Sequence, residues 1–68
     1  MKLVIKDFKR YTLDDISVGL FMPEHSTELC FKSEYRTNGK FECYIVSSGE
    51  FYCGPEERLL RVELQDEN

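Results

Sequence analysis

The chain has 68 residues, fewer than the ~100–200 of a typical domain, so there is room for one compact domain and not for two. Nine Lys and Arg against 13 Asp and Glu give a formal charge of −4, which argues against binding nucleic acid through bulk positive charge. The apolar runs, such as 3–5 and 20–22, are far below the ~18 residues of a membrane helix, and the N-terminal run is too short for a secretory signal. We therefore expect a cytoplasmic protein with no membrane partner.

The composition favours strands over helices. The chain contains no Ala, the strongest helix former, whereas four Tyr, five Phe and several Val and Ile residues favour strands. A core this small supplies roughly 3–5 kcal/mol of net stability, so a partner or a second copy is a natural source of additional stability. We expect an all-β protein in which residues 1–68 form one small domain.

The first third of the chain predicts a short strand, a turn and a second strand. Residues 2–6 have three apolar residues between two lysines, as expected for a short strand with charged ends. Thr12 is a helix-capping residue type with an acidic residue, Asp15, three positions later. Leu13 and Ile16 are apolar and three residues apart, so the segment is typical of a capped turn of helix. Residues 17–22 indicate a turn that leads into a strand, which Pro23 ends.

The middle of the chain contains the strongest local pattern. Residues 27–35 alternate between apolar and charged side chains, and Asn38 and Gly39 then favour the positive φ angles of a type I′ hairpin turn. Alternation resumes over residues 41–46. These residues predict a β-hairpin.

The last third predicts a second turn and two further strands. Residues 47–50 form the turn, residues 51–53 begin a third strand of the meander, and residues 54–57 end it. Leu60, Val62 and Leu64 alternate with charged residues in a closing strand, and the polar residues 65–68 are expected to be a frayed tail.

Five to six short strands joined by tight turns predict a small, strongly bent antiparallel sheet or a partly open barrel of SH3-like size. The layout is Leu13-x-x-Ile16-x-x-Gly19-x-Phe21, then Glu28-Leu29-Cys30-Phe31-Lys32, then Tyr44-Ile45-Val46-x-x-Gly49-Glu50-Phe51, and finally Leu60-x-Val62-Glu63-Leu64. This layout resembles small uncharacterised SH3-like β-barrel proteins of bacteriophages and mobile elements. The resemblance implies a phage origin and a location in the host cytoplasm, and it carries no catalytic residues.

The residue types that catalysis or metal binding requires are sparse. His25 and the three cysteines form the pattern H-x4-C-x12-C-x9-C, which lacks the close C-x-x-C pairing of zinc sites, so buried thiols are the favoured interpretation of Cys30, Cys43 and Cys53. The glycines stand singly, which excludes a phosphate-binding loop. The acidic pairs at 14–15 and 56–57 are expected to be solvated. We expect no enzyme activity, no cofactor and no metal.

The central strands are apolar on both faces, which predicts a contact surface unless the N-terminal segment covers the second face. If Phe41, Cys43 and Ile45 point inward, Tyr44 and Val46 point outward, and Tyr52 joins them from the next strand. The expected partner-binding residues are Tyr44, Tyr52, Glu42, Glu50, Glu56 and Glu57. Tyrosines with an acidic rim suit a protein partner with a basic surface, so we expect an inhibitor of a nucleic-acid-processing or defence enzyme, similar to an anti-CRISPR protein.

Two alternatives belong to other classes of function. A self-associating protein, for example a homodimer, would bind a nucleotide or another small anion through basic side chains and tyrosines. The residues expected to bind this anion are Lys32, Arg36, Lys40, Arg58 and Arg61. A nucleic-acid-binding barrel would use Lys2, Lys6, Lys9 and Arg10, and the acidic balance of the rest of the chain disfavours it.

Overall fold

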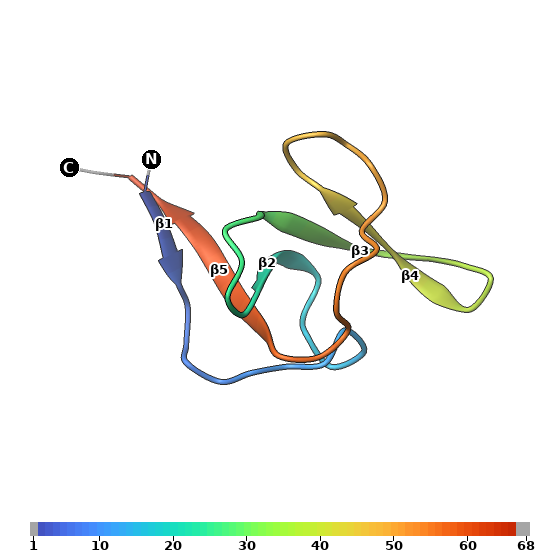
Figure 1. Cartoon of the computed structure of the whole chain (residues 1–68), viewed down its shortest axis with the longest axis horizontal. Helices are drawn as coiled ribbons and strands as arrows, with labels where there is room; N and C mark the ends of the chain where they lie inside the picture. The colour runs from blue at the N-terminus through green and yellow to red at the C-terminus, as the bar shows by residue number, and fades with distance from the viewer. Residues whose placement is uncertain (1, 67–68) are drawn as a thin grey trace.

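The computed structural model describes residues 2–66, which form one antiparallel sheet of five strands and no helix. The strands are β1 (Lys2–Ile5), β2 (Gly19–Pro23), β3 (Cys30–Thr37), β4 (Lys40–Ile45) and β5 (Leu59–Gln65). Their order across the sheet is β1-β5-β2-β3-β4 (Figure 1). The predicted all-β class is confirmed, and the bent sheet does not close into a barrel. None of the described residues belongs to a helix that could span a membrane.

The first and last strands lie side by side at one end of the sheet (Figure 1). The predicted strand at residues 2–6 is confirmed as β1, and it pairs along its whole length with β5, where Lys2 lies opposite Gln65. The expectation of a frayed tail is therefore wrong at Gln65, because pairing with β1 holds the backbone of this residue in the sheet. Residues 67–68 of that predicted tail lie outside the described residues.

The predicted hairpin connects β3 and β4. Asn38 has φ 55° and Gly39 has φ 80°, the two positive values that a type I′ turn requires, so this prediction is confirmed. The register of the two strands shifts between Lys32 and Arg36, which places extra residues on β3. The Ser33 hydroxyl compensates there by donating a 2.8 Å hydrogen bond to the carbonyl of Glu42.

The predicted capped turn begins at Thr12. The Thr12 hydroxyl oxygen accepts a 3.2 Å hydrogen bond from the amide of Asp15, and the Thr12 carbonyl accepts one of 2.9 Å from the amide of Ile16. The structure contains this single turn and no continuing helix. The turn places Ile16 in the core before the chain enters β2 at Gly19, where φ is 134°.

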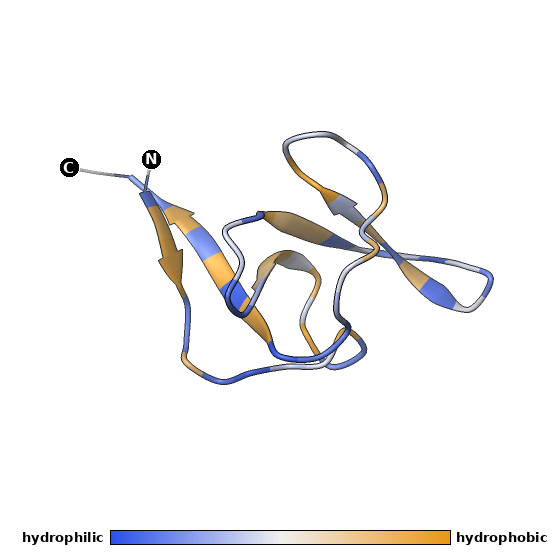
Figure 2. Cartoon of the chain, in the orientation of Figure 1, coloured by the Kyte–Doolittle hydropathy of each residue, from blue (hydrophilic) through white to orange (hydrophobic). Residues whose placement is uncertain are grey.

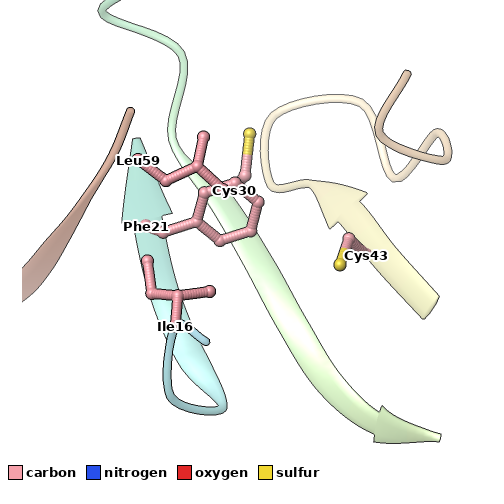
Figure 3. Packing of buried hydrophobic residues seen from close by; sticks show 5 residues of the cluster. All are labelled: Ile16, Phe21, Cys30, Cys43 and Leu59. Atoms are coloured by element: carbon pink, nitrogen blue, oxygen red, sulfur yellow. The ribbon is translucent and has the colours of Figure 1, made fainter. Parts of the chain in front are cut away.

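The core lies on one side of the sheet, which we call the core face (Figure 3). Its buried residues are Ile16, Phe21, Cys30, Cys43 and Leu59, and Tyr11, Leu13, Phe41, Ile45 and Tyr52 pack against them. The segments 11–16 and 50–56 thus cover the core face. Burial of two thiols agrees with the sequence prediction, whereas the third, that of Cys53, is exposed.

The predicted strand at residues 51–53 is wrong, and its side chains have the opposite orientation. This segment makes one isolated bridge, in which Phe51 lies opposite Tyr44, so these two residues share the outward side of the sheet. Phe51 and Cys53 are consequently exposed. Tyr52 points inward and contacts Phe21 edge to face, with ring centroids 5.3 Å apart.

Candidate protein-binding surfaces on the two sides of the sheet

A continuous row of apolar side chains crosses all five strands on the side opposite the core. Because side chains alternate along a strand, directly opposed residues share a face. The opposed pairs are Leu3 with Leu64, Ile5 with Val62, Leu60 with Met22, Leu20 with Phe31, Phe31 with Tyr44, and Tyr44 with Phe51. We call these residues the outer face.

The outer face is exposed in part, since Val62 within it is only 3% exposed. Leu3, Ile5, Phe31, Leu64 and Phe51 are between 38% and 63% exposed. Hydrophobic residues occur in every strand, including the edge strand β1 (Figure 2). Tyr11 and Leu13 of the N-terminal segment pack against the core face. A contiguous apolar surface of this kind marks a contact site in soluble proteins.

Tyr44 and Phe51 form the aromatic end of the outer face, next to strand β4. Their rings stack with centroids 5.2 Å apart. The Tyr44 hydroxyl donates a 2.5 Å hydrogen bond to Glu42, whose second carboxylate oxygen accepts one of 2.8 Å from Thr37. These two hydrogen bonds lower the pKa of Glu42, while the bond to Glu42 raises the pKa of Tyr44. The carboxylate therefore stays ionised at this end.

The two edge strands of the sheet differ in charge. Strand β1, at one edge, begins at the exposed Lys2 and is followed by the exposed Lys6. Strand β4, at the other edge, carries Glu42, and the exposed Glu50 lies in the loop that follows it. Alternation places Lys2 and Lys6 on the core-face side of the β1 edge, whereas Glu42 shares the outer face with Tyr44.

Two acidic pairs lie in two neighbouring loops that a backbone hydrogen bond joins. The amide of Leu13 donates a 2.8 Å hydrogen bond to the carbonyl of Glu56, which joins the turn at 12–16 to the loop at 54–58. Both loops carry an exposed acidic pair. We call the two pairs the acidic loops, and they consist of Asp14, Asp15, Glu56 and Glu57.

A pocket of about 520 Å³ lies between the acidic loops and the β3–β4 hairpin. Its lining includes the carboxylates Asp14 and Glu56, the basic residue Lys40, and the rings of Phe41 and Tyr52. The Tyr52 hydroxyl donates a 2.5 Å hydrogen bond to the carbonyl of Pro55, and burial raises the pKa of this phenol to about 12. Tyr52 is therefore a neutral, partly buried wall of a pocket that two carboxylates and one lysine also line.

The six partner-binding residues expected from sequence fall into two groups on opposite sides of the sheet. Tyr44, with Glu42 and Glu50, belongs to the β4 end of the outer face. Tyr52 lies on the core face and lines the pocket with Glu56, and Glu57 is the next residue of that loop. The expected single surface is divided because Tyr52 points inward, as described above.

Lys32, the first of the basic residues expected to bind an anion, is buried at 2% exposure. Its amine donates hydrogen bonds to the carbonyls of Leu13, Asp14 and Ile16 at 2.6, 3.3 and 2.7 Å. Burial lowers the pKa of this amine. Lys32 therefore stabilises the turn at 12–16, and its amine is not exposed to bind an anion from solvent.

The other four basic residues do not converge. Arg36 stacks over the Phe41 ring at 4.0 Å, and Lys40 lies in the hairpin. Arg58 is exposed at the start of β5 with φ 57°, and Arg61 reaches the Asp7 carboxylate at 3.4 Å. The structure thus distributes these side chains between the hairpin and β5.

His25 and the cysteines are also apart. The His25 side chain is 83% exposed, and its Nε2 atom lies 3.5 Å from Glu24, whose carboxylate is paired with Arg10 at 2.8 Å. The bond to Arg10 lowers the pKa of Glu24. Across residues 2–66, no three His, Cys, Asp or Glu side chains are grouped to hold a metal ion.

Sequence reasoning missed most of the outer face. It singled out Tyr44 and Val46, which do lie outward, with Val46 50% exposed. It assigned no binding role to Phe31, Phe51 and Leu64. The signal was present, because these strands carry apolar residues at successive positions and therefore on both faces of the sheet. Comparison with protein-family models, curated proteins and solved structures finds no match, so the function is argued from this geometry.

Proposed function

We propose that this chain is a non-enzymatic binding protein that docks its acidic loops on a basic surface of another protein. The observation that carries this proposal is that one carboxylate of each acidic pair, Asp14 and Glu56, lines one pocket, and that a backbone hydrogen bond between Leu13 and Glu56 joins the two loops. Loops fixed to a packed core present their charges with little loss of conformational entropy on binding.

The positions of the thiols with shifted pKa values support a binding function rather than a catalytic one. Burial raises the pKa of Cys30 to about 11 and also raises that of Cys43, and both thiols lie in the core. Thiols with raised pKa values are poor nucleophiles at neutral pH. The shifted groups therefore serve packing, and we assign this protein no reaction.

A partner with a nucleic-acid-binding site has the complementary charge. Such sites gather Lys and Arg side chains to contact phosphates. A chain with formal charge −4 that places carboxylates around a pocket competes for those side chains. We propose that the protein inhibits a nucleic-acid-processing or defence enzyme in this way.

The test is affinity capture from a host lysate with three immobilised proteins: the wild type, Glu56→Gln/Glu57→Gln, and the matched control Glu34→Gln/Asp66→Asn. All the changed residues are exposed, and both variants lose the same charge. We expect the wild type and the control to retain a protein that the first variant loses. Mass spectrometry identifies it, and heparin should release it because a polyanion competes for a basic surface.

Equal capture by both variants would contradict the proposal, since the position of the carboxylates would then be irrelevant. Capture that heparin leaves unchanged would contradict it as well. A captured enzyme then allows a direct measurement, in which addition of the wild type lowers its nucleic-acid binding and addition of Glu56→Gln/Glu57→Gln leaves that binding intact.

A further inference from the structure

We infer that the pocket beside the β3–β4 hairpin binds an extended basic segment of the partner protein, which pairs with the open edge of β4 and places one Lys or Arg side chain beside Asp14 and Glu56. The inference deepens the proposed function and rests on it, because it names the part of the partner that the acidic loops contact. It depends on a feature that carboxylates alone do not supply, which is the unpaired backbone of β4.

The edge of β4 is covered at one end and open at the other. The β3–β4 hairpin projects from the sheet, and β4 is its edge strand (Figure 1). At the covered end, the amide of Ile45 donates a 2.8 Å hydrogen bond to the carbonyl of Glu50. The amide of Tyr52 donates one of 2.8 Å to the carbonyl of Cys43. The Cys43 amide points to the same edge as its carbonyl, and it has no hydrogen-bond partner among residues 2–66.

Phe41 lies at the open end. The two-residue turn at 38–39 makes Thr37 and Lys40 the hydrogen-bonded pair that closes the hairpin. The next pair, Arg36 with Phe41, is therefore of the non-hydrogen-bonded kind, and the amide and carbonyl of Phe41 point away from β3. Neither group has a hydrogen-bond partner in the described part of the chain. The open end thus offers two donors and one acceptor in the pattern of a strand.

This open edge is one wall of the pocket, because Phe41 and Cys43 both line it. The pocket volume of about 520 Å³ is within the range of ~300–1,000 Å³ that ligand sites have. Cys43 is only 4% exposed, so its unpaired amide belongs to a residue that is otherwise enclosed by protein. An extended polypeptide supplies the alternating carbonyls and amides that such an edge can pair with. The backbone of the site therefore selects a peptide segment.

The side chains of the pocket select a basic residue within that segment. Directly opposed residues of paired strands share a face, so the residue that pairs with Phe41 has its side chain on the core-face side of β4. Asp14 and Glu56 line the pocket there, and the Tyr52 hydroxyl is already used in its bond to Pro55. A Lys or Arg side chain at this position has the charge that the two carboxylates lack.

The basic residues around Phe41 do not take this place. The Lys32 amine and the Arg36 guanidinium lie 3.9 and 4.0 Å from the centroid of the Phe41 ring, and neither residue lines the pocket. Lys40 does line it, but strand alternation directs its side chain to the same side as Glu42, opposite to that of Phe41. An acidic segment would bring a third carboxylate to Asp14 and Glu56 and be repelled.

The first experiment is a nuclear magnetic resonance titration of the ¹⁵N-labelled full chain with the capped pentapeptide Thr-Val-Arg-Val-Thr. We expect the amide signals of Phe41 and Cys43 to shift, and their hydrogen exchange to slow at least ~tenfold at saturation. The same peptide with Glu in place of Arg should bind at least ~tenfold more weakly. A peptide N-methylated at its Arg keeps the charge but cannot donate to the Phe41 carbonyl, and it should lose at least ~tenfold as well.

The second experiment repeats the titration with two variants. Asp14→Asn/Glu56→Gln should weaken binding of the Arg peptide at least ~tenfold, because both pocket carboxylates become neutral. Glu34→Gln/Asp66→Asn is the matched control, since it loses the same charge at exposed residues outside the pocket lining, and it should bind as the wild type does. Circular dichroism confirms that both variants stay folded.

Unmoved amide signals of Phe41 and Cys43 at ~5 mM Arg peptide would overturn the inference. Equal binding of the N-methylated peptide would overturn it too, because charge alone would then account for the contact. The proposed function is tested separately by capture from the lysate. Capture through Glu56 and Glu57 without peptide binding would mean that the partner presents a folded basic surface. Peptide binding without capture would leave the peptide site standing and remove the proposed function.

Discussion

The amine of Lys32 donates a 2.7 Å hydrogen bond to the carbonyl of Ile16, inside the protein. The turn at 12–16 ends before a helix can continue, so its last carbonyls have no amide partners within a helix. Lys32 reaches these carbonyls from β3, and its amine also lies 3.9 Å from the centroid of the Phe41 ring. A single cation thus connects the turn, the sheet and the hairpin.

Replacing Lys32 by Met should destabilise the fold strongly. Methionine fills a similar volume but leaves the carbonyls of Leu13 and Ile16 buried without a donor, at a cost of roughly 1–3 kcal/mol for each unsatisfied group. We expect a loss of about 3 kcal/mol in the free energy of unfolding, measured by urea denaturation. A domain of this size has roughly 3–5 kcal/mol in total, so the variant should be close to unfolded at 37 °C.

Lys40→Met is the control for this prediction, because Lys40 is exposed in the hairpin and undergoes the same chemical change. It should shift the free energy of unfolding by no more than ~0.5 kcal/mol. Equal effects of the two substitutions would show that Lys32 does not stabilise the turn.

The sequence predicted what local chemistry determines. The Asn38 and Gly39 turn and the Thr12 turn both depend on residues next to one another, and both are present. The all-β class followed from strand-forming residues without Ala. Local preferences and the final fold agree at these positions, as expected for a naturally foldable sequence.

The two sides of the sheet could not be assigned from alternation. Leu29, just before β3, and Phe31 form one apolar series and Cys30 belongs to the other, so periodicity alone does not tell which series enters the core. The structure buries Cys30 and Lys32 and leaves Phe31 on the outer face. Contacts with the turn at 12–16, distant in sequence, decide this. A single bridge, that of Phe51, likewise decides the orientation of the last loop.

Gly39→Ala should weaken the hairpin through its backbone alone. A Cβ atom at Gly39 would have no neighbour within 4 Å, but φ is 80° there, a conformation that costs an L-residue roughly 1–2 kcal/mol. We expect the free energy of unfolding to fall by about 1 kcal/mol in urea denaturation, with the core unchanged by near-ultraviolet circular dichroism. An unchanged unfolding midpoint would contradict the assignment of a type I′ turn.

Gly54→Ala should act through a steric clash instead. A Cβ atom at Gly54 would lie 2.7–2.8 Å from three atoms of the Tyr52 side chain, so the ring or the loop must move. Movement of the ring weakens its edge contact with Phe21, worth about 1 kcal/mol beyond its buried area. We expect a changed near-ultraviolet spectrum as well as lower stability. A native spectrum would mean that the loop accommodates the methyl group without moving Tyr52.

Stability should fall as the pH rises above ~9. Burial raises the pKa of Cys30 to about 11 and that of Tyr52 to about 12, and it also raises the pKa of Cys43. The unfolded chain loses these protons at lower pH than the folded chain, so their stabilisation is complete below pH ~9 and is lost as the pH passes the folded values. Lys32 contributes with the opposite sign, because burial lowers its pKa.

Urea denaturation between pH 7 and 11 measures this dependence. We expect a net loss of stability with pH, since three groups outweigh one, and a shallower slope in Cys30→Ala, which removes a titrating thiol from the core. The slope is the informative quantity, because the substitution also leaves a cavity that lowers stability at every pH. Parallel curves for the two proteins would show that the Cys30 thiol ionises alike in the folded and unfolded chains.

The three thiols should differ sharply in reactivity. Cys53 is exposed beside the pocket, whereas Cys30 and Cys43 are buried at 0% and 4% exposure. At pH 8, a disulfide reagent should modify one thiol per chain quickly and the other two only as fast as the core opens. Cys53→Ser should abolish the fast reaction without changing the slow one. Rapid modification of a second thiol in the native protein would contradict the core, because the sheet and the loop at 50–56 would then not protect Cys43.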